Sequence, residues 1–356
     1  YKEEIQTEIP EVDEILGTMA IDSVVAAIAE VTGGQKRNHI TDPDAALVYG
    51  KHRSVTTGGH FAYLKIAEGC DKRCTYCIIP KVRGNYRSVP MEVLVKEAAE
   101  LAEGGVKELI LVAQETTVYG KDLYGEKRLP RLLQELCRIP GLYWIRLLYC
   151  YPEEIYDELI QTMKEEKKIC HYLDLPIQHA SDRILKRMGR RTTQAELVEI
   201  VNKLRREIPD IVLRTTLISG FPGETQEDHE ELMGFVDEME FDRLGVFTYS
   251  PEEGTPAETM EGQVPEEVKE ARRDEIMELQ QEISFDHSQS MVGRSLDVMI
   301  EGKVADENAY VGRTYMDAPN VDGLIFVNTD EPLMSGDFCK VRVTGALDYD
   351  LIGELL

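Results

Sequence analysis

Short apolar runs rich in β-branched and aromatic residues alternate with longer segments of helical period between residues 61 and 249. The short runs predict strands buried on both faces, and the longer segments predict amphipathic helices. The predicted strands cover 61–66, 108–113, 143–149, 172–177, 211–218 and 244–249. The predicted helices cover 91–102, 129–137, 152–165, 194–208 and 226–239.

The ends of these helices carry suitable capping residues. Thr193 can cap the fourth long helix, and Thr225 with Asp228 can start the fifth. Gly104 and Gly105 can end the first helix in a left-handed turn. Because parallel strands need crossover connections, strands that alternate with helices indicate a parallel sheet. We therefore predict an α/β fold, a partial (β/α)6 TIM-like barrel with its functional groups at the carboxyl ends of the strands.

The pattern changes after the last predicted strand. A long charged helix is predicted near 265–288, and five short strands follow after Gly293, with Gly, Asp, Asn and Pro between them. These strands, at 296–300, 309–314, 324–327, 338–343 and 351–355, predict a small antiparallel barrel of OB-like size.

Residues 1–33 are too short to bury a core of their own. Residues 1–33 have helical spacing interrupted by Pro10, and residues 34–57 are polar and poorly periodic. We expect four parts: the remnant of another domain at 1–33, a linker at 34–57, a core domain at 58–289 and a second domain at 290–356.

Composition and charge restrict the setting of the protein. The 356 residues are 42% hydrophobic and 30% charged, without a run of the roughly 18 apolar residues that a membrane span needs or the start of a signal peptide. Forty basic and 66 acidic residues give a net charge of −26, which repels phosphate backbones unless a local basic patch overrides it. Such a surface suits a basic partner, or serves only solubility. We expect a cytoplasmic protein with no membrane partner.

Three of the seven cysteines lie close together directly after the first predicted strand. Cys70, Cys74 and Cys77 have C-x3-C-x2-C spacing, and no fourth Cys or His lies nearby. Thiolates suit iron–sulfur clusters and zinc. A structural zinc site normally has four protein ligands, so the missing ligand favours an open metal position. Zinc and three unligated buried thiols remain as alternatives.

The cysteine segment resembles the signature of the radical S-adenosylmethionine (SAM) superfamily, with Tyr76 at its aromatic position. The motif and strand order match over residues 61–250. The resemblance implies that the three thiolates bind three irons of a [4Fe–4S] cluster and that the fourth iron binds the amino and carboxylate groups of SAM. One electron would then break the S–C5′ bond, and the resulting 5′-deoxyadenosyl radical would abstract a hydrogen atom.

Further matches to this superfamily lie at other strand ends. Glu115, after the second strand, resembles the residue that contacts the SAM amino group, although Gln114 replaces a glycine. Ile218 and Gly220, after the fifth strand, resemble adenine-contacting positions, where glycine allows close approach. A polar loop and a Gly-Pro turn are the structural alternatives.

The segment at 176–191 resembles the methylthiotransferases within the superfamily, which insert sulfur and a methyl group at C–H bonds. The resemblance places Gln178 and Ser181 at the cofactor pocket. His179 is more simply a structural histidine. The five basic residues of 183–191 would touch substrate or reductant, or form a solvated helix face. No catalytic side chain is assigned.

The terminal segments resemble other parts of the methylthiotransferases. Residues 290–356 resemble their TRAM module, and residues 9–17 resemble the end of their N-terminal domain. That domain carries three cysteines for a second [4Fe–4S] cluster, so we expect a second cluster in a missing N-terminal domain. The four remaining cysteines read as buried thiols: Cys137, Cys150, Cys170 and Cys339.

Two branches of the family compete, one acting on tRNA adenosine and one on the β-carbon of an aspartate in small-subunit ribosomal protein twelve. Residues 291–356 carry five basic and twelve acidic residues, and this net charge of −7 favours a basic ribosomal protein over RNA. The segment 313–323 also resembles the ribosomal-protein branch. We expect that branch, a reading face near Asp317 and Asp322, and an electron donor such as flavodoxin or ferredoxin. The tRNA enzyme is the alternative, and a non-catalytic metal-binding module is a weaker one.

The first prediction concerns the cluster. Replacing Cys70, Cys74 or Cys77 by Ala should abolish production of 5′-deoxyadenosine from SAM, because an iron would lose its protein ligand. Replacing Cys137 or Cys339 by Ala should leave production within about twofold of the parent protein, since neither is expected to bind metal. Chromatographic detection of 5′-deoxyadenosine after anaerobic reconstitution measures both. Cleavage of SAM by the Cys74→Ala variant would contradict the assignment.

Overall fold

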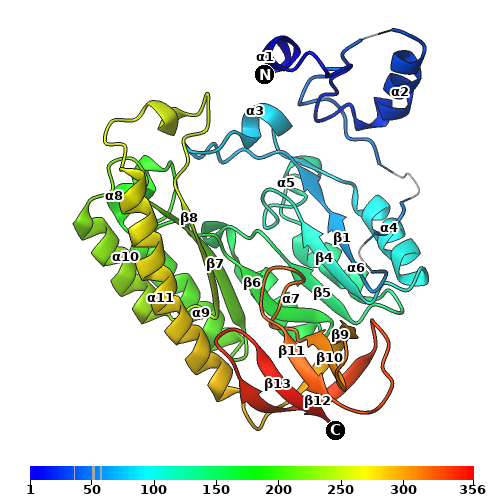
Figure 1. Cartoon of the computed structure of the whole chain (residues 1–356), viewed down its shortest axis with the longest axis vertical. Coiled ribbons are helices and arrows are strands. Elements are labelled where there is room, and N and C mark those ends of the chain that lie inside the picture. Colours follow the sequence, from blue (N-terminus) through cyan, green and yellow to red (C-terminus); the bar gives the residue numbers. More distant parts are fainter. Residues whose placement is uncertain (36, 50–52, 57) are drawn as a thin grey trace.

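A parallel sheet of six strands forms the centre of the molecule. The computed structural model describes residues 1–35, 37–49, 53–56 and 58–356 (Figure 1). The strand order is β1-β4-β5-β6-β7-β8 and every neighbouring pair is parallel, which confirms the predicted partial (β/α)6 barrel. The strands are β1 (Phe61–Lys65), β4 (Glu108–Val112), β5 (Trp144–Leu147), β6 (Ile169–Asp174), β7 (Val212–Ser219) and β8 (Arg243–Thr248).

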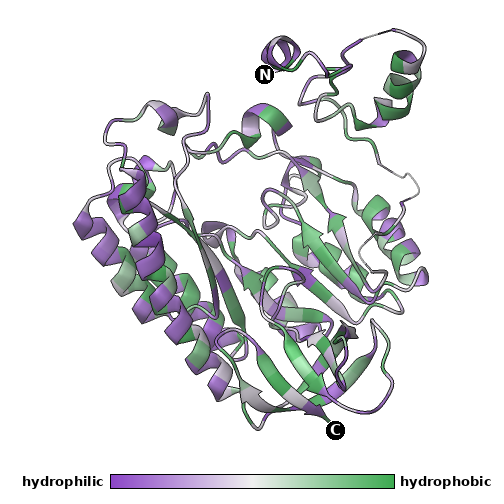
Figure 2. Cartoon of the chain, viewed as in Figure 1, coloured by the Kyte–Doolittle hydropathy of each residue, from purple (hydrophilic) through white to green (hydrophobic). Residues whose placement is uncertain are grey.

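Helices connect these strands and cover the sheet. Figure 2 shows the strands as largely hydrophobic and the long helix α11 (Glu266–Ser290) as largely hydrophilic. The predicted N-cap at Thr193 is present and forms a capping box with Glu196, and the predicted start at Thr225 and Asp228 is also a capping box. The long crossover helices are α4 (Met91–Glu103), α6 (Leu129–Cys137), α7 (Asp157–Glu165), α9 (Gln194–Glu207) and α10 (Gln226–Met239). The short helices are α3 (Ile79–Arg83), α5 (Lys121–Tyr124) and α8 (Asp182–Arg187).

Two predicted elements differ from the structure. The helix expected at 152–165 is divided into a 3-10 turn, η2 (Pro152–Glu154), and α7, because Ile155 and Tyr156 are extended and pack against the core. The strand expected at 172–177 starts earlier, at Ile169, and ends at Asp174. Its later apolar residues are buried in a loop rather than in the sheet, which hydropathy alone does not distinguish.

The C-terminal residues form the expected small barrel, closed in the order β10-β11-β13-β12-β9. Four of its five strand pairs are antiparallel, but β11 and β13 are parallel. The prediction of a purely antiparallel barrel is therefore wrong at this one pair. The strands are β9 (Ser295–Lys303), β10 (Ala309–Arg313), β11 (Ile325–Asn328), β12 (Phe338–Ala346) and β13 (Leu351–Leu355).

The N-terminal segment contains short helices at the end of the molecule away from the barrel (Figure 1). Of the linker expected at 34–57, residues 36, 50–52 and 57 lie outside the described residues. Within the described residues, every helix is too short or too polar to cross a lipid bilayer. The remaining elements are α1 (Lys2–Glu8), η1 (Ile21–Ser23), α2 (Val24–Thr32), the hairpin of β2 (Ala67–Glu68) and β3 (Arg87–Ser88), and η3 (Pro256–Thr259).

A buried ion network joins the amino ends of the sheet strands to the barrel. The carboxylate of Glu108, at the start of β4, has no exposed surface. One of its oxygens lies 2.7 Å from Nε of Arg146 on β5, and the other lies 2.7 Å from Nη2 of Arg313 on β10. Glu301 on β9 lies 2.6 Å from Nε of the same Arg313. Two strands of the sheet and two strands of the barrel are thus tied together by groups that would be costly to bury singly.

The loop between β10 and β11, residues 314–323, completes this contact, and we call it the docking loop. Its Asp317 lies 2.7 Å from Nη2 of Arg243, and the hydroxyl of Tyr172 donates to Asp322 at 2.7 Å. The expectation that these two aspartates lie on an exposed reading face is therefore wrong. Asp317 is 3% exposed and pairs with Arg243 on β8. The sequence does not predict this burial, because the spacing of the two residues does not place them side by side.

This burial also changes the charge argument. Seven acidic and four basic residues of 291–356 are exposed, so the net charge of the exposed residues is −3, compared with −7 for the whole segment. The acidic residues are Asp297, Asp306, Glu307, Asp330, Glu331, Asp348 and Glu354. The module still has an acidic surface, but much of its formal charge serves the contact with the sheet.

The buried network makes a prediction about stability. Arg313→Met should lower the free energy of unfolding by about 3–5 kcal/mol, because it leaves the buried Glu108 carboxylate with one of its two arginines missing. Lys340→Met removes an exposed pair with Asp297 and should cost less than about 1 kcal/mol. Thermal denaturation compares the two variants, and hydrogen exchange in the docking loop reports local release. Equal effects of the two changes would contradict the role given to the network.

Candidate cofactor site at the cysteine loop

The cysteine loop, residues 69–77, begins directly after β2. Gly69 has φ +79°, and a Cβ atom there would lie 2.1 Å from the carbonyl oxygen of Asn85, so only glycine fits. The amide of Cys70 donates to the carbonyl of Gly84 at 3.2 Å, and the amide of Thr75 donates to Met188 at 2.9 Å. The backbone of the loop is therefore fixed from two sides before any ligand binds.

All three cysteines of the loop are free thiols. Cys70 and Cys74 are buried and Cys77 is half-buried. Their sulfur atoms do not all lie within 4.8 Å of one another, whereas a tetrahedral zinc ion with bonds of about 2.3 Å holds sulfurs about 3.8 Å apart. Burial raises the pKa of Cys70 to about 11 and also raises the pKa of Cys77. The three sulfur atoms are therefore not arranged as a preformed zinc site.

Tyr76 joins the cysteine loop to the end of β7. Its ring packs edge to face on Phe221, with centroids 6.3 Å apart, and it belongs to the same apolar group as Ile218. The amide of Ile218 donates to the carbonyl of Gln178 at 2.8 Å, and Gln178 has a positive φ of 72°. Three predicted site residues, Tyr76, Ile218 and Gln178, are thus brought to one side of the loop.

Glu115 lies at the end of β4 and is 1% exposed. One carboxylate oxygen accepts hydrogen bonds from the amide and hydroxyl of Thr117, and the other lies 3.8 Å from Nζ of Lys72 without a hydrogen bond. Burial raises the pKa of Glu115 to about 7, although the Thr117 hydrogen bonds and the Lys72 charge act in the opposite direction. The side chain therefore presents a buried acceptor beside the cysteine loop.

The other two predicted residues are occupied by protein contacts. The hydroxyl of Ser181 donates to Asp228 at 2.7 Å, at the start of α10. A Cβ atom on Gly220 would lie 2.2 Å from Cγ of Lys269, so this glycine is required by packing against α11. Their proposed contacts with SAM remain predictions. His179 has no exposed surface, and its Nδ1 accepts from the amides of Ala180 and Ser181, as expected of a structural histidine.

Sequence reasoning missed two residues beside the cysteines, Tyr151 and Arg190. The Tyr151 hydroxyl lies 3.7 Å from Sγ of Cys74, and the Arg190 guanidinium lies 4.3 Å from the centre of the Tyr151 ring. Arg190 is one of the five basic residues of 183–191, and at 6% exposed it does not belong to a solvated helix face, whereas its contact with substrate or reductant stays a prediction. The sequence offered only a weak signal for Tyr151, which precedes Pro152 after the third strand of the sheet.

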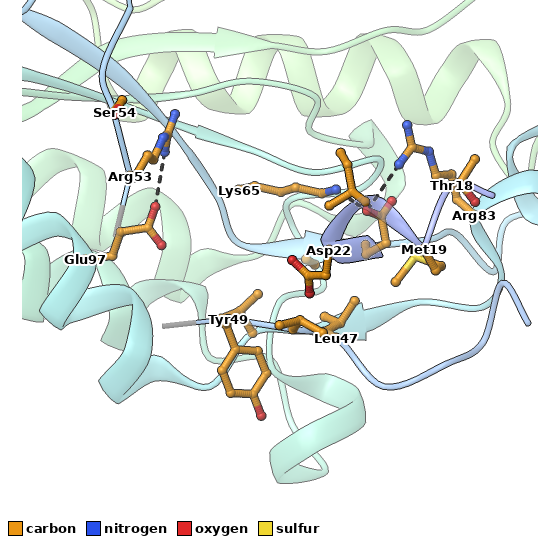
Figure 3. Close-up of a pocket in the computed structure, with 15 residues that line it drawn as sticks. Thr18, Met19, Asp22, Leu47, Tyr49, Arg53, Ser54, Lys65, Arg83 and Glu97 are labelled. Carbon is orange, nitrogen blue, oxygen red and sulfur yellow. Dashed lines mark hydrogen bonds and ion pairs between the residues drawn. The ribbon is translucent and has the colours of Figure 1, made fainter. Parts of the chain in front are cut away.

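A cavity of about 550 Å³ lies elsewhere, between the N-terminal segment and the outer edge of β1 (Figure 3). Its basic side chains have partners: Arg53 lies 3.1 Å from Glu97, and Arg83 lies 3.6 Å from Glu68. Lys65 also pairs with Glu68. Because these charges are already balanced, we place the chemistry at the cysteine loop.

Comparisons with known proteins agree with this placement. A model described as the radical SAM superfamily matches residues 64–236, and one described as the TRAM domain matches residues 292–356. The ribosomal protein uS12 methylthiotransferase RimO of Lachnoclostridium phytofermentans is 63% identical over 353 residues, covering 99% of this chain and 80% of the relative. The RimO of Caldanaerobacter subterraneus is 49% identical with the same coverage. The chain belongs to the RimO family of methylthiotransferases.

Among solved structures, methylornithine synthase aligns over 64% of this chain and 64% of its own, with 16% identity and a TM-score of 0.46. The relatives confirm the ribosomal-protein branch over the tRNA branch. Membership in a radical SAM family implies a [4Fe–4S] cluster and SAM.

The side chains present fit these two cofactors. The three thiols are grouped with no fourth ligand among the described residues, which suits a cluster with one open iron. Several buried polar atoms have no hydrogen-bond partner among the described residues: acceptors on Gln114 and Glu115, and the Nε and Nη1 donors of Arg190. A ligand with both an ammonium and a carboxylate group, such as SAM, can satisfy both kinds of atom.

The cysteine loop makes a prediction about cofactor loading. Gly69→Ala should lose most of the iron bound after reconstitution, because the added Cβ collides with a backbone carbonyl and displaces the thiols. Gly105→Ala is a matched control, since Gly105 also has a positive φ of 103° but has nothing within 4 Å of the added atom. Iron and sulfide per chain measure the effect. Full iron content in Gly69→Ala would show that the loop does not need this glycine.

Proposed function

We propose that this chain is the radical SAM part of an enzyme that adds a methylthio group to the β-carbon of an aspartate in ribosomal protein uS12, with one SAM as methyl donor and one as radical source. The observation that carries the proposal is the loop of three free thiols beside the Glu115 oxygen that has no hydrogen-bond partner among the described residues. The RimO relatives, named for uS12, support the substrate.

In this proposal Cys70, Cys74 and Cys77 hold the cluster. When bound, the cluster supplies the electron that cleaves the S–C5′ bond of SAM. The free oxygen of Glu115 accepts a hydrogen bond from the SAM ammonium, since it is a buried acceptor that lacks a donor. The other proposed contacts of SAM are with Tyr76, Gln178, Ser181, Ile218 and Gly220.

The proposal also assigns parts and partners. Residues 58–289 form the catalytic domain and residues 290–356 form the module that recognises substrate. The net charge of −26 supports a basic ribosomal protein as partner and disfavours nucleic acid as the direct substrate. A flavodoxin or ferredoxin provides the electron, and the reaction takes place in the cytoplasm.

We propose further that the transferred sulfur comes from a second [4Fe–4S] cluster held outside residues 1–356. Three of the four remaining cysteines are buried on separate elements: Cys137 on α6, Cys150 after β5 and Cys170 on β6. Cys339, the fourth, is half-buried on β12 of the small barrel. Within the part of the chain that the structure describes, these thiols form no second metal-binding group.

The test uses uS12 deuterated at the β-carbon of its aspartates. The reconstituted chain, given SAM and a low-potential reductant, should form 5′-deoxyadenosine that contains deuterium from uS12, which mass spectrometry detects. Cys74→Ala should form none, and Cys339→Ala should behave as the parent protein.

Three outcomes would contradict parts of the proposal. Product without deuterium in the presence of uS12 would show that this aspartate carbon does not supply the hydrogen atom. Transfer of deuterium from a labelled tRNA adenosine instead would favour the tRNA reaction. Replacement of one hydrogen of uS12 by SCH3 with this chain alone would contradict the second-cluster proposal.

A further inference from the structure

Tyr151 lies directly against one of the proposed cluster ligands. It is 6% exposed, and its hydroxyl oxygen lies 3.7 Å from Sγ of Cys74, within hydrogen-bonding distance for sulfur. Its backbone amide is also fixed, because it donates a hydrogen bond to the Thr117 hydroxyl at 3.1 Å. That hydroxyl in turn donates to Glu115, so Tyr151 is held by the same network that holds the proposed SAM contact.

Two cations lie over the ring of Tyr151. The guanidinium carbon of Arg190 is 4.3 Å from the ring centroid, and Nζ of Lys72 is 4.9 Å from it. Arg190 is fixed by a hydrogen bond to the carbonyl of Pro176 at 3.1 Å and by Glu153 at 3.4 Å. A tyrosine beneath two cations is a stronger hydrogen-bond donor, because positive charge draws electron density from the phenol.

Burial strengthens the electrostatic effect of the Arg190 charge on its surroundings. The guanidinium of Arg190 is shielded from water, and its Nε and Nη1 have no hydrogen-bond partner among the described residues. Electrostatic interactions in such an environment are screened much less than at the surface. Arg190 and the Tyr151 hydroxyl therefore act together on the sulfur of Cys74.

We propose that Tyr151 and Arg190 set the reduction potential of the cluster, with the Tyr151 hydroxyl donating a hydrogen bond to the Cys74 thiolate and Arg190 adding positive charge behind it. This inference rests on the proposed assignment of Cys74 as a cluster ligand. One external electron converts [4Fe–4S]2+ to [4Fe–4S]1+, and no bond to the protein forms or breaks. Since the reduced cluster carries one more negative charge, a donor and a cation stabilise it more than the oxidised form.

Both residues are positioning residues in this inference and need not touch SAM. A purely structural role for Tyr151 would require its ring but not its hydroxyl. Tyr151→Phe keeps the ring beneath both cations and removes only the donor, so this variant separates the two roles.

The experiment is a redox titration of the reconstituted chain without SAM, with dithionite as electron donor and viologen dyes as mediators. The electron paramagnetic resonance signal of [4Fe–4S]1+ is followed. At a fixed potential, Tyr151→Phe should show a ratio of reduced to oxidised cluster about tenfold lower than the parent protein, which corresponds to about 59 mV for one electron. Arg190→Gln should shift the ratio in the same direction, and Arg190→Lys, which keeps the charge, should recover most of it.

Tyr156→Phe is the matched control. Tyr156 also lies beneath a lysine, with Nζ of Lys127 4.7 Å from its ring, but its buried hydroxyl has no hydrogen-bond partner among the described residues. Its titration should match the parent protein.

The possible failures are distinguishable. If the parent protein binds no [4Fe–4S] cluster, the proposed function fails and the inference fails with it. If the parent binds a cluster and Tyr151→Phe, with the same iron content, titrates at the same potential, only the inference fails. Loss of iron from Tyr151→Phe would assign the hydroxyl to cluster assembly and would also overturn the redox role.

Discussion

The structure depends on how the carboxylate of Glu108 is neutralised. This carboxylate lies at the amino end of a central parallel strand and has no contact with solvent. One of its oxygens pairs with an arginine of the sheet, and the other pairs with an arginine of the small barrel. Burying an unpaired charge in that position would cost a large free energy, so the barrel must contact the sheet in the one orientation that pairs Arg313 with Glu108. An apolar cluster shared by the sheet and the barrel adds buried apolar area to this contact, but the ion network fixes the orientation of the barrel on the sheet.

The opposite end of the sheet, at the carboxyl ends of its strands, holds the candidate site. There the polar atoms are left incompletely satisfied, as Gln114, Glu115 and Arg190 show, and residues such as Tyr149 and Gln178 adopt left-handed backbone conformations. Such strain persists only where the surroundings hold it, and the ion pairs of Glu108 with Arg146 and Arg313 tie the amino ends of the strands to the barrel. Stability and chemistry are therefore separated along the strand axis, as in other barrels built from parallel strands.

Local sequence signals predicted the elements well, because their causes are local. The capping boxes at Thr193 and Thr225 and the spacing of the three cysteines depend on residues a few positions apart. The misplaced reading face shows the limit: Asp317 and its partner Arg243 are 74 residues apart, so the sequence gives no sign that this charge is buried. Tyr151 was missed for the same reason, since it meets Cys74 only in the fold.

The reach of the Glu108 network along the chain has a consequence for synthesis on the ribosome. Glu108 and Arg146 are separated by 38 residues and can pair early, whereas Arg313 lies 205 residues beyond Glu108. Until the small barrel has left the exit tunnel, the amino ends of the sheet lack their second arginine and expose the apolar surface that the barrel covers. The nascent chain can therefore bind chaperones until strands β9–β13 emerge. These strands then cover the amino ends of a sheet whose first strand starts at residue 61.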